Sequence, residues 1–410
     1  MHTINKFLNL IFLSLLSIPR SLINVEGRVL PDGEGGGDGI VPSDGICSTA
    51  VIVHGFKCRE YDVTTDDGYI LSVQRIPEGR ADGDGGQTRR PVLLQHGLLV
   101  DGMTWLKNSP EQSLAMMLAD HGFDVWISNL RGTRFSRRHD SLDPNSSEFW
   151  DWSWDELVIH DLPSVIDFVS KQTGQQIHYA GHSMGTLIAM ASLSEDKFKN
   201  VKSAALLSPV AYTSNVTSPV LIAGARSFIG EIGQTYGIPE FDPNGLEATR
   251  YLVETICSLN VKCGDLMTEL TGKNCCLNET TVKNFLEDDL QPSSTKNMVH
   301  LSQGVRSGVV SKYDYGVVGN LQKYGAVQPP VYDLSKIPSD FPLFISYGGQ
   351  DAMADVKDVG ILLDILRSTH DEDKMEVRYV EEYAHVDFIM GVNANGRVYN
   401  HIVDFFRKYD

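Results

Sequence analysis

The sequence predicts an α/β fold, in which a mostly parallel central sheet has helices on both faces and a mainly helical insertion interrupts the alternation. Short apolar runs alternate with amphipathic stretches of helical length through most of the 410 residues, and this pattern is typical of βαβ units. The alternation stops near residue 213 and resumes near residue 336. We therefore expect one α/β body, 47–212 and 336–410, with a cap or lid inserted at 213–335 over the C-terminal edge of the sheet.

The elements of the body follow in chain order. Strand patterns occur at 69–76, 92–95, 124–128, 177–180 and 204–208, and helical patterns lie around 111–121, around 155–171 and from about 185. Beyond the insertion come a strand pattern at 343–347, a helical pattern near 356–367, a strand pattern at 375–380 and a C-terminal helix. Because the strands are short and apolar and the helices between them amphipathic, consecutive strands should run parallel.

The N-terminus predicts the compartment. Residues 7–18 (FLNLIFLSLLSI) form an apolar run after Lys6, which is long enough for a signal peptide and too short to span a bilayer. We expect a signal peptide over 1–27, cleaved between Ser21 and Gly27, and a flexible Gly/Asp-rich leader over 28–46. No other stretch is apolar enough for a transmembrane segment.

Three sequons fit passage through the secretory route, at Asn145, Asn215 and Asn278. We therefore expect the protein to be secreted or to reach the lumen of a lysosome or vacuole, with its cysteines oxidised.

The charge balance excludes some partners. With 35 Lys+Arg against 53 Asp+Glu, the formal net charge is −18. Nucleic acid binding needs a basic stripe, and none is visible. The same balance gives no electrostatic attraction to anionic lipid.

A strand–turn–helix pattern at 177–186 carries the catalytic signal. The strand IHYA (177–180) is followed by GHSMG (181–185) and then by helix-forming residues, which matches the G-x-S-x-G nucleophile elbow. In that motif a strained conformation exposes the serine Oγ, and the two glycines leave room where strand and helix meet. Ser183 is the predicted nucleophile; the alternative is an incidental glycine-rich turn.

A serine nucleophile needs a histidine base, which in this motif comes last in the order serine, acid, histidine. Four histidines follow Ser183. His300 lies in the insertion, His370 follows a helix and belongs at the opposite end of the sheet, and His401 lies in the last helix. His385 follows the last strand at the end where the serine emerges, so we predict that it is the base.

The predicted acid is Asp351, on the tight turn YGGQD that ends the strand at 343–347. Asp355 and Asp358 compete with it, but both fall at the start of the next helix, where acids commonly cap. Asp387, two residues past the base, is expected to support the site from behind or to be an exposed charge.

Two backbone N–H groups should stabilise the oxyanion. One belongs to Met184, the residue after the nucleophile, and the other to Leu98, in the glycine-containing turn after the strand at 92–95. His96 is expected to hold this loop rather than to react.

The six cysteines divide by position. Cys47 and Cys58 flank the start of the body and could pair. The other four lie in the insertion, at Cys257, Cys263, Cys275 and Cys276. Because a bond between neighbouring cysteines forces strained geometry, Cys275 and Cys276 are not expected to bridge each other. We predict one disulfide at the start of the body and two in the cap, and no metal site, since there is no C-x-x-C motif.

Together these segments resemble the acid lipase family, which includes gastric and lysosomal acid lipases and plant triacylglycerol lipase relatives. The resemblance runs in order from about residue 47 to the C-terminus through YDVTTDDGYILSVQRIP (61–77), LLQHGLL (93–99), DVWISNLRGTRFSRRH (124–139), FWDWSWDEL (149–157), YAGHSMGT (179–186), LLSPVAY (206–212), YGGQDAMAD (347–355) and HVDF (385–388). Met184 and the run TGKNCCLN (271–278) look most like the plant members.

The resemblance implies an α/β-hydrolase core, a capping lid and hydrolysis of triacylglycerols or steryl esters at a lipid interface. Its triad maps onto Ser183, Asp351 and His385, and its oxyanion donors onto Leu98 and Met184. No metal or organic cofactor is expected. Acyl transfer to an alcohol, cleavage of soluble esters, and a non-catalytic binding protein remain the alternatives.

Apolar stretches of the cap at 220–225 and 228–232, together with Trp105, could line an acyl pocket, or the stretches could form the cap's own core. Family members vary in the cap, so substrate preference carries over least.

Overall fold

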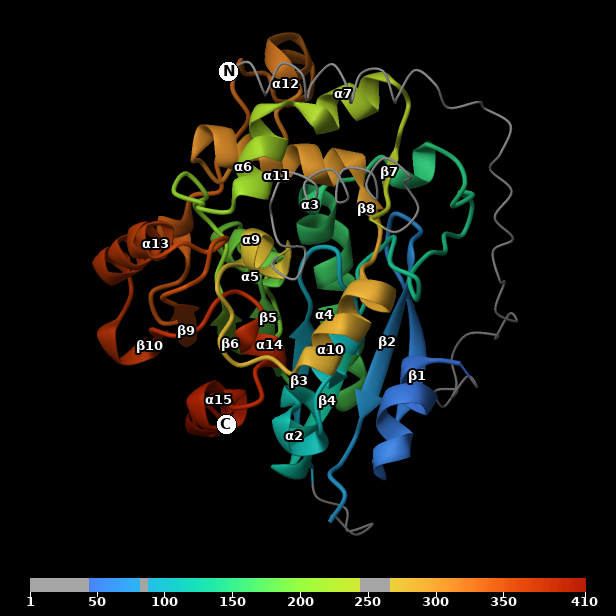
Figure 1. Ribbon diagram of the computed structural model, residues 1–410, viewed down its shortest axis with the longest axis vertical. Helices are drawn as coiled ribbons and strands as arrows, with labels where there is room; N and C mark the ends of the chain where they lie inside the picture. Colours follow the sequence, from blue (N-terminus) through green and yellow to red (C-terminus); the bar gives the residue numbers. More distant parts are fainter. Residues whose placement is uncertain (1–43, 82–87, 244–265) are drawn as a thin grey trace.

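The computed structural model describes residues 44–81, 88–243 and 266–410 (Figure 1). The predicted signal peptide, most of the leader, and Cys257 and Cys263 lie outside these residues. An eight-stranded sheet has the order β1-β2-β4-β3-β5-β6-β9-β10. Its strands are β1 Arg59–Thr64, β2 Ile70–Ile76, β3 Arg90–Gln95, β4 Phe123–Ser128, β5 Ile177–His182, β6 Val201–Leu207, β9 Leu343–Gly348 and β10 Met375–Val380.

The sheet is mostly parallel, as predicted. Strand β2 pairs antiparallel with β1 and with β4, whereas β4, β3, β5, β6, β9 and β10 all pair in parallel. Every predicted strand is present. The sequence reading missed β1, an edge strand whose residues are mostly exposed or half-buried and carry no apolar run. Parallel pairing places the carboxyl ends of β3, β5, β6, β9 and β10 at one edge of the sheet, where loops commonly build sites.

Helices cover both faces of the sheet because side chains alternate along each strand. In β3, Leu93 belongs to the hydrophobic core on one face, together with residues of α4 (Leu162–Thr173), α5 (Met184–Ser194) and α13 (Val356–Thr369). Its neighbours Val92 and Leu94 belong to the core on the other face, together with residues of α2 (Leu114–Asp120) and α15 (Asn400–Lys408). The predicted α/β class with helices on both faces is therefore confirmed.

A long connection runs between β6 and β9, from residue 208 to residue 342; we call it the β6–β9 connection. Its described elements are α6 Pro219–Arg226, α7 Ile229–Thr235, β7 Glu240–Phe241, α9 Leu266–Thr271, α10 Glu279–Asn284, β8 Ser293–Ser294, α11 Thr295–Ser307 and α12 Gly316–Tyr324. Helices α6, α7, α11 and α12 lie together beyond the carboxyl ends of the parallel strands (Figure 1). In the part of the chain that the structure describes, no helix has the length and apolar character to cross a membrane.

The disulfides correct one prediction. Cys47 and Cys58 are bonded, as the sequence suggested. Cys275 and Cys276 are also bonded, to each other, so the prediction that neighbouring cysteines would not bridge is wrong. The physical reason lies in the local backbone: the N–H groups of both cysteines are held by one buried carboxylate, that of Asp387, at 3.2 and 3.1 Å. This arrangement directs both N–H groups to one acceptor in the conformation in which the two sulfurs are bonded.

Candidate active site

Ser183 occupies the turn between β5 and α5 in a strained backbone conformation. Its φ is 55° and its ψ is −121°, a combination that non-glycine residues adopt rarely and that active sites often impose. The Ser183 N–H donates to the Leu207 carbonyl (3.1 Å), which ties the turn to the neighbouring strand β6. The serine is nearly fully buried, with 6% exposure.

The two glycines of the motif are required by close backbone approaches. A Cβ on Gly185 would lie 2.5 Å from the Gln95 carbonyl oxygen, and a Cβ on Gly181 would lie 2.9 Å from the Gly185 carbonyl. The hydroxyl of Tyr179 donates to that same Gly185 carbonyl (2.7 Å). The spacing of the motif therefore comes from the packing of α5 against β3 and β5.

His385 and Asp351 form a buried pair. The Nδ1 of His385 lies 2.9 Å from Oδ2 and 3.1 Å from Oδ1 of Asp351, so an N–H at Nδ1 donates to the carboxylate. The opposite nitrogen, Nε2, is buried and has no partner among the described residues. An imidazole arranged in this way has its tautomer fixed by the acid and its second nitrogen available as a base.

Asp351 is held in its charged form. Burial alone would raise its pKa, but the positive charge and hydrogen bond of His385 and the N–H groups of Ala354 (2.8 Å) and Met353 (2.9 Å) together hold the pKa below its ordinary value. An ionised acid is what stabilises an imidazolium.

His385 lies next to the nucleophile turn. The ring centroids of His182 and His385 are 4.8 Å apart, and the Nε2–H of His182 donates to the His385 carbonyl (2.9 Å). The hydroxyl of Ser208 also donates to that carbonyl (3.3 Å). The residue before Ser183 thus fixes the backbone of His385, and the structure brings all three predicted triad residues to one edge of the sheet.

Two of the competing histidines, His300 and His370, have other partners. His300 stacks on Trp154, with centroids 4.3 Å apart, and its Nε2–H donates to the Ser311 carbonyl. The Nε2–H of His370 donates to the Phe341 carbonyl (2.7 Å).

The competing acids are also engaged. Asp355 caps α13 by accepting the Lys357 N–H (2.8 Å). Asp358 is buried and accepts the Asn215 N–H (2.8 Å).

The loop after β3 lies against Ser183. A Cβ on Gly97 would lie 2.8 Å from Cβ of Ser183. His96 holds this loop, because its Nδ1–H donates to the Gly97 carbonyl (2.8 Å) and its Nε2 accepts the Leu130 N–H (3.0 Å). Burial lowers the pKa of His96 to about 4, which keeps it neutral and able to accept.

Leu98 lies in this loop, and Met184 is the first residue of α5. Among the described residues neither N–H donates to a protein acceptor. Unpaired backbone donors beside a nucleophile can receive a developing oxyanion.

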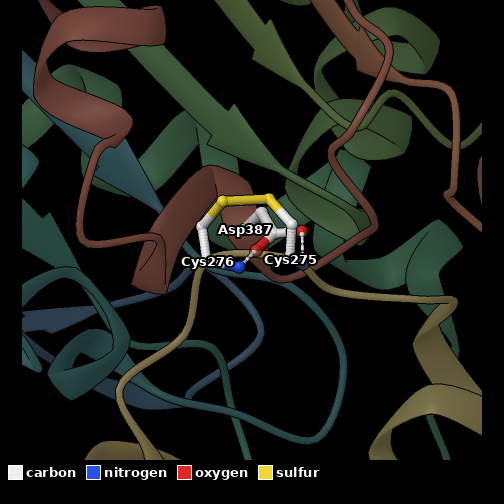
Figure 2. A group of neighbouring side chains, drawn as sticks. All are labelled: Cys275, Cys276 and Asp387. Carbon is white, nitrogen blue, oxygen red and sulfur yellow. Dashed lines mark hydrogen bonds between the residues drawn. A yellow bond between two sulfur atoms is a disulfide. The ribbon is translucent and has the colours of Figure 1, made fainter.

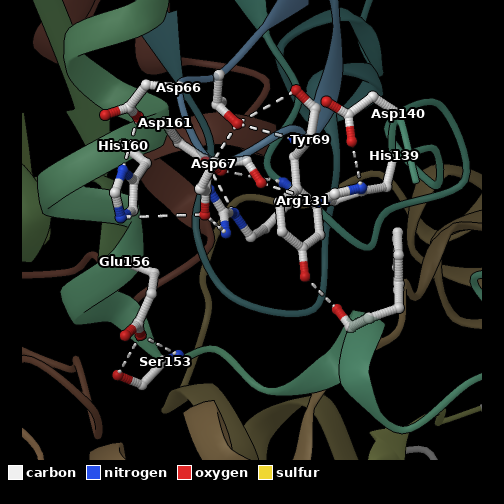
Figure 3. A network of polar contacts seen from close by, with 12 residues as sticks. Asp66, Asp67, Tyr69, Arg131, His139, Asp140, Ser153, Glu156, His160 and Asp161 are labelled. Atoms are coloured by element: carbon white, nitrogen blue, oxygen red, sulfur yellow. Dashed lines mark hydrogen bonds and ion pairs between the residues drawn. The ribbon is translucent and has the colours of Figure 1, made fainter. Parts of the chain in front are cut away.

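A buried ion-pair network supports the loop that anchors His96 (Figure 3). Arg131, directly after Leu130, is 1% exposed and donates to Asp161 (2.7 Å) and to both oxygens of Asp67 (2.7 and 2.9 Å). Its guanidinium also lies 3.8 Å from the ring centroid of Tyr69. A planar, bidentate cation of this kind fixes the backbone direction of the loop after β4.

The sequence reading missed a part of the β6–β9 connection that contacts the site, residues 271–277. The Thr271 carbonyl accepts the N–H of Ala352 (3.3 Å) and of His385 (3.2 Å). The N–H groups of Cys275 and Cys276 donate to the Asp387 carboxylate, and Asp387 is fully buried. The run TGKNCCLN was visible in the sequence, but nothing local connects it with residues about a hundred positions later.

Two groups of potential metal ligands occur among the described residues: Cys275, Cys276 and Asp387 in one, and Asp66, Asp67 and His160 in the other. In the first, the sulfurs are bonded to each other. In the second, Asp67 pairs with Arg131, and His160 Nδ1 lies 2.6 Å from Asp66. The ligand atoms of both groups already have protein partners.

Comparisons with known proteins agree with this geometry. Residues 47–109 match the partial alpha/beta-hydrolase lipase region, and residues 90–379 match the alpha/beta hydrolase fold. Triacylglycerol lipase 2 of Arabidopsis thaliana is 53% identical, covering 89% of this chain and 88% of the relative. Human gastric triacylglycerol lipase is 37% identical (88% and 90%), and human lysosomal acid lipase/cholesteryl ester hydrolase is 37% identical (87% and 89%).

Solved structures share the fold at low identity. A carboxyl esterase from Bacillus coagulans superposes with a TM-score of 0.55 at 14% identity, covering 86% of this chain and 98% of that one. A soluble variant of monoglyceride lipase from Saccharomyces cerevisiae gives 0.53 at 15% identity (85% and 95%). With more than a third of its residues identical to those of curated lipases over nearly the whole length, the chain belongs to the acid lipase family of the α/β-hydrolase fold.

Proposed function

We propose that the chain is a serine ester hydrolase, a lipase that cleaves carboxylic esters of long- or medium-chain fatty acids. The observation that carries the proposal is the buried His385–Asp351 pair beside the strained turn of Ser183. The names of its relatives point to triacylglycerols or cholesteryl esters as the substrate class.

In the proposed mechanism, Nε2 of His385 takes the Ser183 proton as Oγ attacks the ester carbonyl. Asp351 stabilises the imidazolium, and the Leu98 and Met184 N–H groups bind the oxyanion. His385 then protonates the departing alcohol and activates water, which releases the fatty acid from Ser183. The chemistry needs no metal or organic cofactor.

The β6–β9 connection supplies the proposed cap, 213–335, inserted in a body formed by 47–212 and 336–410. Its helices α6, α7, α11 and α12 lie beyond the end of the sheet that carries Ser183 (Figure 1). An acidic chain of net charge −18 would have to meet a lipid surface through apolar rather than electrostatic contacts. The gastric and lysosomal names of relatives, with the apolar N-terminus, favour a secreted or lumenal location.

The test is Ser183→Ala in the full-length chain. Turnover of a triacylglycerol emulsion and of a soluble p-nitrophenyl ester should fall by at least roughly 10³-fold, because the acyl-enzyme cannot form. The thermal unfolding curve of the variant should match that of the wild type. Retained turnover with an intact fold would overturn the proposal, as would failure of a fluorophosphonate probe to label Ser183 in the wild type.

A further inference from the structure

Residues 271–277 bind both of the loops that carry the proposed acid and base; we call them the 271–277 strap. At its start, the Thr271 carbonyl accepts the N–H groups of Ala352 and His385, and Gly272 forms a β-bridge with Asp351. At its end, the Cys276 carbonyl accepts the Val392 N–H (2.8 Å). The strap therefore connects the turn after β9 with the loop after β10.

The centre of the strap is tied to the base by one carboxylate. Asp387 is 0% exposed, and it accepts the N–H groups of Cys275 (3.2 Å), Cys276 (3.1 Å) and Ala384 (2.8 Å). Ala384 directly precedes His385. The Asp387 carboxylate thus joins the backbone of the two cysteines to the backbone of the proposed base.

The disulfide restricts the peptide group between the two cysteines. Figure 2 shows the bonded cysteines arching over the Asp387 carboxylate, with hydrogen bonds to it from both backbone nitrogens. A bond between adjacent cysteines closes a small ring that contains the peptide group joining them. The ring restricts rotation around that peptide group and so fixes the direction of the Cys276 N–H, while the Cys275 nitrogen is attached to the ring at its Cα. Consecutive N–H groups that converge on one anion form a compact anion-binding arrangement.

The two cysteines of this bond are also more exposed than those of the other described disulfide. Cys275 is exposed and Cys276 half-buried, whereas Cys47 and Cys58 are both buried. Because thiol–disulfide exchange needs access to a sulfur atom, an external dithiol can reach the 275–276 bond more readily than the 47–58 bond.

We propose that the Cys275–Cys276 disulfide is a redox modification site that positions His385 through Asp387, with a dithiol as the reducing partner. This inference rests on the proposed roles of Ser183, Asp351 and His385. The dithiol donates two electrons and two protons; the S–S bond breaks, two thiols form, and the dithiol becomes a disulfide. The opened ring frees the 275–276 peptide group, and the loop that carries the base loses its fixed anchor.

The first experiment follows turnover and thiol content together. The full-length protein is equilibrated with graded ratios of reduced to oxidised dithiothreitol, kcat and KM are measured on a soluble short-chain p-nitrophenyl ester, and free thiols are then trapped with iodoacetamide and mapped by mass spectrometry. We expect kcat to fall roughly ten- to a hundredfold, in step with labelling of Cys275 and Cys276, while KM changes little. An unchanged kcat with both cysteines labelled would overturn the proposal.

Matched variants separate this bond from the other disulfides. Cys47→Ser/Cys58→Ser should keep the redox dependence, whereas Cys275→Ser/Cys276→Ser should have the low kcat at every redox ratio. A persisting redox transition in the second variant would contradict the assignment. Ser183→Ala should be inactive at every redox ratio, and activity in this variant would overturn the proposed function. If Ser183→Ala is inactive but the kcat of the wild type does not depend on the redox ratio, the present inference alone fails.

Asp387→Asn breaks the same link with the disulfide intact. An amide keeps one acceptor oxygen where the carboxylate offers two, so kcat should fall and the apparent pKa of the kcat/KM profile, which reports the base, should shift. Asp355→Asn is the matched control, because asparagine caps a helix as well as aspartate does, and its profile should equal that of the wild type. An Asp387→Asn profile identical to the wild type would contradict a positioning role.

Discussion

Burial and charge act on Asp351 in opposite directions. Removing the carboxylate from water favours its neutral form, but His385 and two backbone N–H groups favour the charged form and hold the pKa below its ordinary value. The competing acid Asp358 is equally buried but faces Asn215 rather than a histidine. The partner, rather than burial itself, distinguishes the acid suited to catalysis.

Asp351→Asn tests this electrostatic role. The amide can neither stabilise an imidazolium nor hold the Nδ1–H tautomer of His385, so we expect kcat to fall by roughly 10³- to 10⁴-fold with little change in KM. The measurement is steady-state hydrolysis of a soluble ester, with Asp355→Asn as the control. A loss below about tenfold would show that another group orients the base.

Single residues were predictable where chemistry restricts them to one pattern. That Ser183, Asp351 and His385 lie at one edge of the parallel sheet could be predicted, because each follows a strand there; their catalytic roles stay a prediction. The sequence left Asp387 as either a support for the site or an exposed charge; its contacts with the cysteine N–H groups and the bond between Cys275 and Cys276 could not be predicted. They depend on contacts between segments about 110 positions apart, and such contacts leave no local pattern in the sequence.

At the scale of elements, the site depends on how closely α5 approaches the end of β3. The Gly185 Cα faces the backbone carbonyls of Gln95 and His96. These two residues lie where β3 ends and the loop that carries the Leu98 N–H begins. The same contact therefore sets both the stability of the elbow and the distance between the two proposed oxyanion donors.

Gly185→Ala is predicted to destabilise the protein and to lower turnover. The new Cβ would lie 2.5 Å from the Gln95 oxygen and 3.0 Å from the His96 oxygen, so strand and helix must separate, at a cost of roughly 1–3 kcal/mol. The control is Gly360→Ala in α13, where a Cβ meets nothing within 4 Å and alanine should add roughly 0.5–1 kcal/mol of stability. Urea unfolding measures both, and equal effects would contradict the packing argument.

The elements of the body could be predicted from apolar runs, and their observed bounds differ from the predicted ones by a few residues. The β6–β9 connection could be recognised only by its lack of alternation. Its described helices have nine residues or fewer, apart from α11 with 13. Strands β7 and β8 have two residues each, too few to form the apolar runs that mark the strands of the body. Their positions are set by tertiary contacts, such as the Gln291 N–H that donates to the Leu99 carbonyl (2.9 Å).

At the scale of the whole molecule, acid acts on stability through buried neutral histidines. Burial lowers the pKa of His96 to about 4 and the pKa values of His182 and His300 to about 3, against an ordinary value of 6.5. As the pH falls below 6.5, the unfolded chain binds protons at these sites and the folded chain does not. Their contribution to stability is therefore complete above pH 6.5 and declines as the pH falls toward the folded values.

His300→Gln tests the contribution of one of these histidines to the pH dependence of stability. The net charge of −18 also changes with pH, and its declining self-repulsion opposes the histidine effect, so the wild-type curve alone does not separate the two. The difference between wild type and variant does, because both share every other titrating group. Between pH 6 and pH 4, the free energy of unfolding of the wild type should fall more steeply than that of the variant, by about 1.4 kcal/mol per pH unit. Urea unfolding at several pH values measures the two slopes.

The substitution to glutamine also removes the stacking of His300 on Trp154. This loss lowers the free energy of unfolding of the variant at every pH, but it does not change how that free energy varies with pH. Parallel curves would mean that His300 binds its proton as readily in the folded protein as in the unfolded chain, which the buried ring and its single carbonyl partner do not support.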